Sequence, residues 1–257
     1  MSVFKTFGKY RNLLRELVKK DIKLKYRNSY LGVIWTMLEP LLTMIVLTLV
    51  FSKLLGKGTR DFPVYILTGR LLYSFFSNGT KAALRSVRAN SGMIKKVYVP
   101  KYMYPFASVL SGYIIFLISL IVLAVVATVR GVYPTLRLIW IVLPLIQILL
   151  LTIGVGLILA TVAVFFRDVE YLWGVALMLI MYTSAIFYQA ETVINAGNAW
   201  IFKLNPLYAV IVNFRNAVFG QAMDFRSMWY ATVCGALSLL IGIIVFYKKQ
   251  DKFILYL

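Results

Sequence analysis

Apolar residues in this chain come in long runs that short basic segments separate. A helix that crosses the hydrocarbon core of a bilayer needs about 20 predominantly apolar residues. The second of the candidate segments is the weakest, because it contains polar residues that include Arg70, Asn78 and Lys81. The pattern predicts an all-α integral membrane protein with six transmembrane helices, in residues 31–52, 63–84, 105–129, 138–165, 171–190 and 228–247.

Residues 10–27, ahead of the first run, show helical rather than continuous apolar spacing. Leu13, Leu17 and Val18 share one side of a helix, and basic residues occupy most other positions. This pattern is typical of an amphipathic helix in the cytoplasmic interface of a membrane, or of a helix that packs on a partner subunit. Residues 1–30 contain nine basic residues and no apolar core of the length that a secretory signal needs.

Three parts of the chain are therefore expected. Residues 1–30 form an N-terminal cytoplasmic amphipathic helix, residues 31–250 a transmembrane domain and residues 251–257 a cytoplasmic tail. Within the transmembrane domain, the pair Asn205–Pro206 is a typical helix start. The apolar stripe that follows carries polar residues, and we expect short re-entrant helices on the external face there.

The composition supports a membrane protein and shows how it is oriented. Hydrophobic residues make up 61% of the chain and charged residues 14%, against about 45–50% and 25% in soluble domains. A net charge of +19 would suit a nucleic-acid-binding protein, but the basic residues flank apolar runs and form no single basic face. With both termini in the cytoplasm, 19 of the 28 basic residues lie on the inner side, as the positive-inside rule requires. No nucleic-acid partner is expected.

Several kinds of chemistry are excluded. The chain has no histidine and one cysteine, Cys234, so His-based metal sites, His-dependent triads and an internal disulfide are absent. No GxxxxGK[ST] loop is present, so this chain is not expected to hydrolyse ATP. We predict no catalytic residue, no metal site and no cofactor on the chain itself.

Ionisable residues inside the predicted spans are few. Glu39 and Arg70 are the main ones, too few for a proton relay, and Glu39 has either a structural role opposite a polar group or a direct role in transport. A membrane-embedded glycolipid enzyme is an alternative from another class. It would need metal-binding carboxylates, and Asp168 and Glu170 are the only close pair. Arg167 beside them favours a salt bridge instead.

Four stretches resemble one family, the ABC-2 type permeases that export polysaccharides such as O-antigen, capsule and teichoic acid. The first stretch, residues 25–40, has a basic-aromatic-basic triplet, an LGxxW motif and a helix-internal proline: Lys25, Tyr26, Arg27, Leu31, Gly32, Trp35 and Pro40. The third contains Arg167 and Asp168, and the fourth Asn205, Pro206, Leu207 and Arg215. The match departs at residues 68–77, where Arg70 is unusual for the family.

The second stretch, residues 86–101, is similar to the cytoplasmic helix that docks on the ATPase subunit in this family. A short polar helix with lysines at its C-terminal end is a compact handle for a partner, although a simple positive-inside loop would look alike. The expected ATPase-coupling helix consists of Asn90, Ser91, Gly92, Met93, Ile94, Lys95, Lys96 and Val97.

The resemblance implies a transport subunit rather than an enzyme. Two copies of the chain would form a homodimer around a central path in the bacterial cytoplasmic membrane, in contact with membrane lipids. Two separate ATP-binding-cassette subunits would bind ATP and Mg²⁺ and drive export of a lipid-linked polysaccharide. The same scaffold could alternatively export a drug, a peptide or a lipid.

A sugar polymer needs aromatic faces and hydrogen-bonding groups along its path. Candidate lining residues are Trp35, Tyr65, Tyr73, Phe76, Tyr182, Phe187 and Tyr188, although aromatic residues also anchor helices at membrane interfaces. Lys25 and Arg27 are placed to receive a lipid diphosphate. They would serve equally well as ordinary inside charges. Glu39, Pro40, Arg167, Asp168, Asn205, Pro206 and Arg215 are expected to have structural roles.

Overall fold

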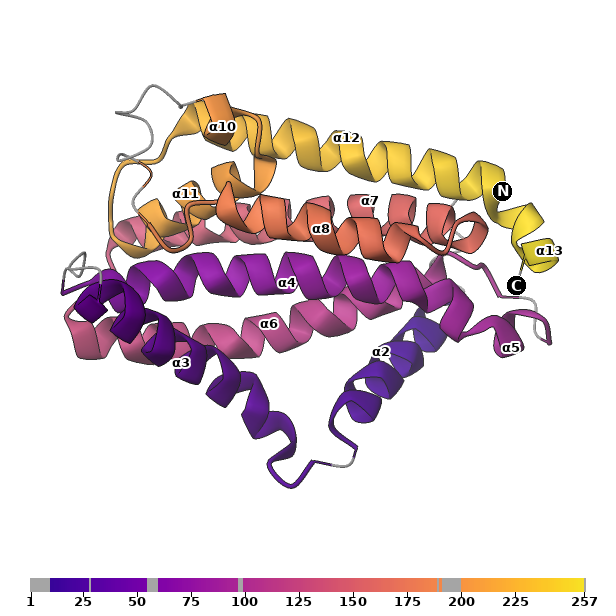
Figure 1. Cartoon of the computed structure of the whole chain (residues 1–257), viewed down its shortest axis with the longest axis horizontal. Helices are drawn as coiled ribbons and strands as arrows, with labels where there is room; N and C mark the ends of the chain where they lie inside the picture. Colours follow the sequence, from indigo (N-terminus) through magenta and orange to yellow (C-terminus); the bar gives the residue numbers. More distant parts are fainter. Residues whose placement is uncertain are drawn as a thin grey trace.

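The computed structural model describes residues 10–27, 29–54, 60–96, 99–188, 190 and 200–256 (Figure 1). All regular secondary structure in these residues is helical, which confirms the predicted class. The helices are α2 (Arg11–Tyr26), α3 (Trp35–Thr48), α4 (Phe62–Ala89), α5 (Ser91–Ile94), α6 (Met103–Arg130), α7 (Val142–Phe165), α8 (Val169–Tyr182), α10 (Trp200–Lys203), α11 (Pro206–Val218), α12 (Phe225–Lys249) and α13 (Phe253–Tyr256). Residues 1–9 of the predicted N-terminal part and Leu257 of the predicted tail lie outside the described residues.

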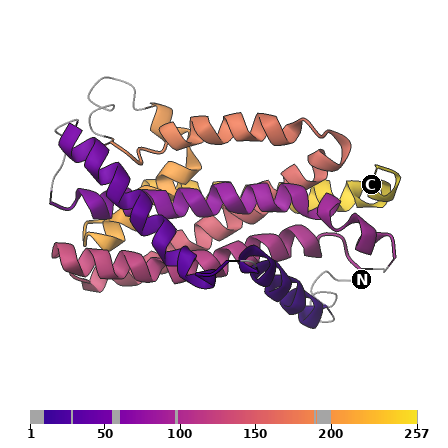
Figure 2. The same ribbon diagram turned by 60° about the horizontal axis from the view of Figure 1, so that its bottom comes forward.

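Four long helices, α4, α6, α7 and α12, run along the long axis of the molecule and form its bundle (Figures 1 and 2). Helix α7 packs between α4 and α12, and α6 packs on both α4 and α7. The core is built from apolar residues of α4, α6 and α7, among them Leu72, Met103 and Ile148, which are fully or almost fully buried. The bundle is the scaffold that positions the peripheral helices α2, α3 and α8.

Small residues bring α7 and α12 into backbone contact. A Cβ atom on Gly154 would collide with the backbone of Ser238 and Leu239, and one on Gly242 would lie 2.6 Å from the Gly154 carbonyl oxygen. The Gln147 side chain adds hydrogen bonds to the Met228 carbonyl oxygen at 3.0 Å and to the Thr232 hydroxyl at 2.8 Å. Small residues and interhelical polar contacts of this kind stabilise helix pairs in membranes, where apolar burial supplies little driving force.

Four helical segments are long and apolar enough to cross a membrane: Gly32–Phe51, Met103–Arg130, Leu136–Phe165 and Phe225–Tyr256. They coincide with the first, third, fourth and sixth predicted spans. Helix α4, at the second predicted span, has 28 residues and is more polar. Helix α8, at the fifth, has only 14 residues and ends at Tyr182, short of the predicted residue 190.

Helix α8 ends early because the chain turns at its C-terminal side. Ala185 has a positive φ of 46°, a conformation that no helix continues. The Asn205 side chain then donates hydrogen bonds to the hydroxyls of Thr183 and Ser184, at 3.1 and 3.0 Å. The same side chain caps α11 by accepting from the backbone N–H groups of Leu207 and Tyr208. Asn205–Pro206 therefore starts a helix, as predicted, and also ties it to the end of α8.

The first candidate span contains a proline whose lost hydrogen bond is replaced from another helix. Pro40 lies inside α3 and has no N–H to donate to the Thr36 carbonyl oxygen. The Ser119 hydroxyl of α6 donates to that oxygen at 2.9 Å. Inside a membrane a freed carbonyl needs such a partner, because no water is available to it. Pro40 thus joins α3 to α6.

Helix α2 confirms the predicted amphipathic helix, and its apolar side packs on α6 of the same chain. Leu17 and Val18 are buried, whereas Lys19, Lys20 and Lys23 are exposed. The Ser108 hydroxyl of α6 donates to the Asp21 carboxylate at 3.0 Å. Figure 1 shows α2 and α3 meeting at an angle, with their elbow directed away from the bundle.

Candidate functional site

Helix α4 carries a polar stripe on one face. Most of its residues are buried, and between Arg70 and Arg85 the polar residues that keep exposed or half-exposed side chains recur every three or four positions. That spacing places them on one side of a helix. The stripe consists of Arg70, Ser74, Asn78, Lys81 and Arg85. We call these five residues the α4 stripe.

The helices beside the α4 stripe are apolar. Helix α8 runs along one side of α4 and α3 crosses it obliquely from the other (Figures 1 and 2). Large apolar side chains remain exposed on both, such as Val46 of α3 at 58% and Val175 of α8 at 69%. Apolar side chains are stable against lipid, but Arg and Lys in a membrane face water or the interior of an assembly. The α4 stripe is therefore the part of this surface that needs a polar environment.

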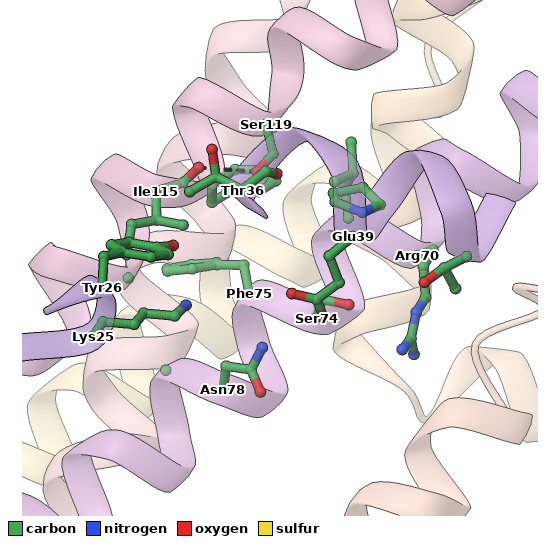
Figure 3. A pocket seen from close by; sticks show the side chains of 16 residues that line it. Lys25, Tyr26, Thr36, Glu39, Arg70, Ser74, Phe75, Asn78, Ile115 and Ser119 are labelled. Carbon is green, nitrogen blue, oxygen red and sulfur yellow. Dashed lines mark hydrogen bonds between the residues drawn. The ribbon is translucent and has the colours of Figure 1, made fainter. Parts of the chain in front are cut away.

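A small cavity opens at the N-terminal part of the α4 stripe, inside the angle between α2 and α3. Figure 3 shows Arg70, Ser74 and Asn78 of α4 lining it together with Glu39 of α3 and Lys25 of α2. Its volume is about 80 Å³, and one water molecule takes about 30 Å³ in the liquid. The cavity thus has room for a few waters and not for a sugar polymer. Ionisable groups of both signs meet there.

The charges around the stripe are unevenly compensated. The Arg85 Nε donates to Glu170 Oε1 at 2.7 Å, and Arg88 lies 3.5 Å from Glu170 Oε2. Arg70 lies over the ring of Tyr73, 6.0 Å from its centre. In the described part of the chain Arg70, Lys81 and Glu39 form no ion pair within 4.0 Å.

Glu170 corrects one sequence-based expectation. We expected a salt bridge within the Arg167, Asp168 and Glu170 cluster, but Glu170 pairs with Arg85 and Arg88 of α4. Asp168 lies at the start of α8, and neither it nor Arg167 has an ion pair among the described residues. The reason is tertiary, because the first turn of α8 comes to lie beside the C-terminal half of α4. The described residues also hold no group of three His, Cys, Asp or Glu that would suit a metal ion.

The predicted aromatic path residues do not lie together on one surface. Trp35 and Tyr182 are exposed, at 42% and 58%. Tyr73 and Phe76 are buried on the side of α4 that meets α8, where the Tyr73 hydroxyl donates to the Leu177 carbonyl oxygen at 2.9 Å. Both residues thus contact α8.

The other three aromatic candidates form contacts near the end of α8. The Tyr65 hydroxyl donates to the Tyr188 carbonyl oxygen at 2.9 Å, and Phe187 stacks on Phe51 at 5.5 Å between ring centres. Tyr188 is half-buried, and its hydroxyl donates to the Tyr182 carbonyl oxygen. These three residues thus form contacts between segments of one chain.

Arg215, expected to be structural, is buried beside Tyr65. Its guanidinium donates to the carbonyl oxygens of Ala185 at 3.0 Å and Tyr65 at 3.1 Å, and it lies 3.5 Å from the centre of the Tyr65 ring. A third hydrogen bond goes to the Thr68 hydroxyl at 3.4 Å. The five N–H groups of arginine suit such a site, because burial without hydrogen-bond partners would be costly. Arg215 thus ties α11 to α4 and to the turn after α8.

The expected coupling helix appears as α5, directly after α4. Gly92, Met93, Lys95 and Lys96 are exposed, and Ser91 is half-buried, whereas Ile94 is buried against the protein's own core. The side-chain amide of Asn90 closes α4: its Nδ2 donates to the Ser86 carbonyl oxygen at 2.8 Å, and its Oδ1 accepts from Lys20 Nζ of α2 at 3.1 Å. Val97 lies outside the described residues. The large side chains that this segment exposes are therefore Met93 and the two lysines.

Lys25 and Arg27, the candidates for a lipid diphosphate, are both exposed at the C-terminal end of α2. Only Lys25 lines the cavity beside the α4 stripe. Its Nζ lies 5.6 Å from the ring centre of Tyr26, a cation–π distance. The two residues thus take different positions, one facing the cavity and one at the elbow between α2 and α3.

The α4 stripe is the feature that we did not predict from the sequence. Its residues marked the second span as weak, because polar side chains lower its mean hydropathy. The spacing from Arg70 to Ser74, Asn78 and Lys81 was nevertheless available. It indicates that one face of a spanning helix is polar, rather than that the helix spans poorly.

Comparison with known proteins finds relatives that are similar along almost the whole chain. The chain is 29% identical over 243 residues to the O-antigen export system permease protein RfbA of Klebsiella pneumoniae, covering 94% of this chain and 93% of the relative. It is 27% identical to RfbA of Myxococcus xanthus, with 95% of both chains covered. It is 24% identical to the polysialic acid transport protein KpsM of Escherichia coli, with 91% and 92% covered.

The sequence profile of the family described as ABC-2 type transporter matches residues 12–219. That range begins in α2, includes the α4 stripe and α5, and ends just after α11. It contains the four stretches on which the resemblance was based. The chain therefore belongs to the ABC-2 type transporter family.

Proposed function

We propose that this chain is the membrane-spanning permease subunit of an ABC exporter that moves a lipid-linked polysaccharide across the bacterial cytoplasmic membrane. The observation that carries the proposal is the α4 stripe, a row of polar and cationic side chains between apolar helices. Such a row needs a water-filled path, and a second copy of the chain would supply the opposite wall. The relatives named as O-antigen and polysialic acid transporters support a polysaccharide as the cargo.

The proposed topology has six spans and cytoplasmic termini. Four spans have the necessary length and hydropathy, and α4 joins them because 28 residues of helix extend about 42 Å, more than the hydrocarbon core of about 30 Å. Helix α8, with 14 residues, is about 21 Å long and would complete its crossing through residues 183–188. Helices α10 and α11 would then lie at the external face as re-entrant helices.

The motor would be a separate pair of ATP-binding-cassette subunits, which would hold ATP and Mg²⁺. Their docking surface in this proposal is the exposed part of α5, with Met93 as the apolar contact and Lys95 and Lys96 as flanking charges. Because α5 follows α4 directly, a displacement of α5 would act on the helix that carries the stripe. The contact between Lys20 and Asn90 would carry the same displacement to α2.

Co-purification with the ATPase tests this proposal. The tagged chain is co-expressed with a candidate ATP-binding-cassette subunit from its gene neighbourhood. It is tested as wild type and with Met93, Lys95 and Lys96 changed to Ala. We expect the wild-type chain to retain the ATPase. The triple variant should retain at least about tenfold less of it, which corresponds to a loss of roughly 1.4 kcal/mol in binding free energy. Ile94 is left unchanged because it is buried, so a loss of binding does not reflect a disrupted core.

A matched control changes Lys248 and Lys249 to Ala. Both residues are exposed at the C-terminal end of α12. These changes should leave ATPase binding unaltered. A wild-type chain that purifies without any ATPase and exports no polysaccharide in cells would refute the proposal.

A further inference from the structure

Resting on the proposed function, we propose that the exported polysaccharide is acidic and that Arg70 and Lys81 of the α4 stripe recognise its negative charges. The inference concerns the class of polymer, one that carries carboxylate or phosphate groups along its length. It follows from which charges of the stripe are left without a carboxylate partner. The polymer is distinct from the diphosphate of its lipid carrier, which neutral and acidic polymers would share.

A path for a neutral polymer needs hydrogen-bonding groups only. Ser74 and Asn78, in the middle of the stripe, supply a hydroxyl and an amide that both donate and accept. A cation in a membrane span is unfavourable unless it has a partner or faces water. Arg70 and Lys81 lie on either side of Ser74 and Asn78. Their positive charges are therefore unfavourable in the span unless they bind an anion.

Among the residues that the structure describes, neither cation forms an ion pair. Arg85 is already neutralised by Glu170, at 2.7 Å between Nε and Oε1. Arg70 has the Tyr73 ring at 6.0 Å, and the described residues contain no carboxylate within 4.0 Å of Arg70 or Lys81. The positive-inside rule accounts for charges near a cytoplasmic helix end. Arg70 lies eight residues from the other end of α4, at Phe62, so the rule does not account for it.

Glu39 is the opposing charge and does not cancel the excess. It faces the same cavity as Arg70, and so does Lys25 of α2 (Figure 3). Lys25, Arg70 and Lys81 against Glu39 leave an excess of positive charge in each copy. Two copies facing each other would double it. Apolar walls such as those of α3 and α8 focus the field of these charges into the space between them and raise the local concentration of anions.

The test compares two polymers on one carrier in the same cells. A host that lacks its own exporter receives this chain with its ATPase, and makes either a neutral hexose homopolymer or the matching uronic acid homopolymer on the same polyprenyl diphosphate. Surface polymer is measured over time. We expect wild type to export the uronic acid polymer about tenfold faster, at the lower end of electrostatic focusing effects.

Variants show whether Arg70 is responsible. Arg70→Gln should lower export of the uronic acid polymer about tenfold and leave export of the neutral polymer within about twofold. Lys81→Gln should act in the same direction. Arg226→Gln, which removes an exposed arginine near the start of α12, away from the stripe, is the matched control and should change neither rate.

The possible outcomes distinguish a failure of the acidic-polymer proposal from a failure of the proposed function. Equal or faster export of the neutral polymer by wild type, or an equal loss of both polymers in Arg70→Gln, overturns the inference and leaves the proposed function standing. Export of neither polymer, while the chain still retains the ATPase at the membrane, overturns the proposed function and the inference with it.

Discussion

Arg215 and Gly69 show how one small residue makes room for a buried charge. The Arg215 guanidinium reaches carbonyl oxygens on two segments and the face of Tyr65 because α4 has no side chain at Gly69. A Cβ atom on Gly69 would lie 2.6 Å from Nη2 of Arg215, well inside the contact distance. A cation that is forced out of this position would leave its hydrogen-bond partners unsatisfied.

We predict that Gly69→Ala destabilises the protein by about 1–3 kcal/mol, the usual cost of overpacking. The measurement is the melting temperature of the detergent-solubilised chain. Gly174→Ala is the control, because nothing lies within 4 Å of a Cβ atom at that position in α8. It should be neutral or stabilising, since Ala favours helices over Gly by about 1 kcal/mol. Equal melting temperatures for Gly69→Ala and wild type would contradict this prediction, because they would show that the Arg215 side chain moves aside without loss of stability.

At the scale of elements, the docking of α2 on α6 depends on pH through Asp21. Burial raises the pKa of Asp21 above its ordinary value of 3.8, and the Ser108 hydrogen bond and the nearby Lys20 oppose this only in part. A carboxyl with a raised folded-state pKa stabilises the fold below its unfolded pKa. That contribution is lost as the pH rises through the folded-state pKa.

We therefore expect Asp21→Asn to strengthen the contact at neutral pH, because the amide keeps an acceptor for the Ser108 hydroxyl and has no charge to bury. The gain in melting temperature over wild type should grow from about pH 4 to pH 7, as the carboxylate ionises. Glu16→Gln is the control, since Glu16 is exposed and pairs only with Lys19 at 2.9 Å. A lower melting temperature for Asp21→Asn than for wild type at pH 7 would mean that Lys20 compensates the carboxylate fully.

At the scale of the whole molecule, the single chain exposes a surface that does not suit lipid throughout. The α4 stripe is polar, while the neighbouring sides of α3 and α8 are apolar. A second copy that meets the first across this face would enclose the stripe and bury the apolar sides. This arrangement is the homodimer of the proposed function.

Cross-linking tests the homodimer. In a Cys234→Ser background, Ser74→Cys places a thiol in the middle of the α4 stripe, and we expect a short bis-maleimide to join two chains in membranes. Val233→Cys is the control, because Val233 is exposed on α12, which packs on α7, on the side away from α4. Cross-linking at Val233 and not at Ser74 would place the interface on the opposite side of the bundle.

The sequence predicted the positions of the helices more accurately than the contacts between them. The helix in residues 10–27, the helix start at Asn205–Pro206 and four spanning helices follow from local spacing, and all are present. The length of α8 and the ion pairs of Glu170 were mispredicted. The turn at Ala185 and the meeting of Glu170 with Arg85 depend on residues far apart in the chain.

By itself, the sequence determined the membrane class, the ABC-2 family and the absence of an ATP-binding loop, because hydropathy, short motifs and missing motifs are local properties. Only the tertiary structure decided which side chains face an open surface. It turned Tyr73 and Phe76 inward against α8 and left the α4 stripe partly exposed. The physical reason is that a helix has several faces, and the neighbours that pack on it decide which of them is buried.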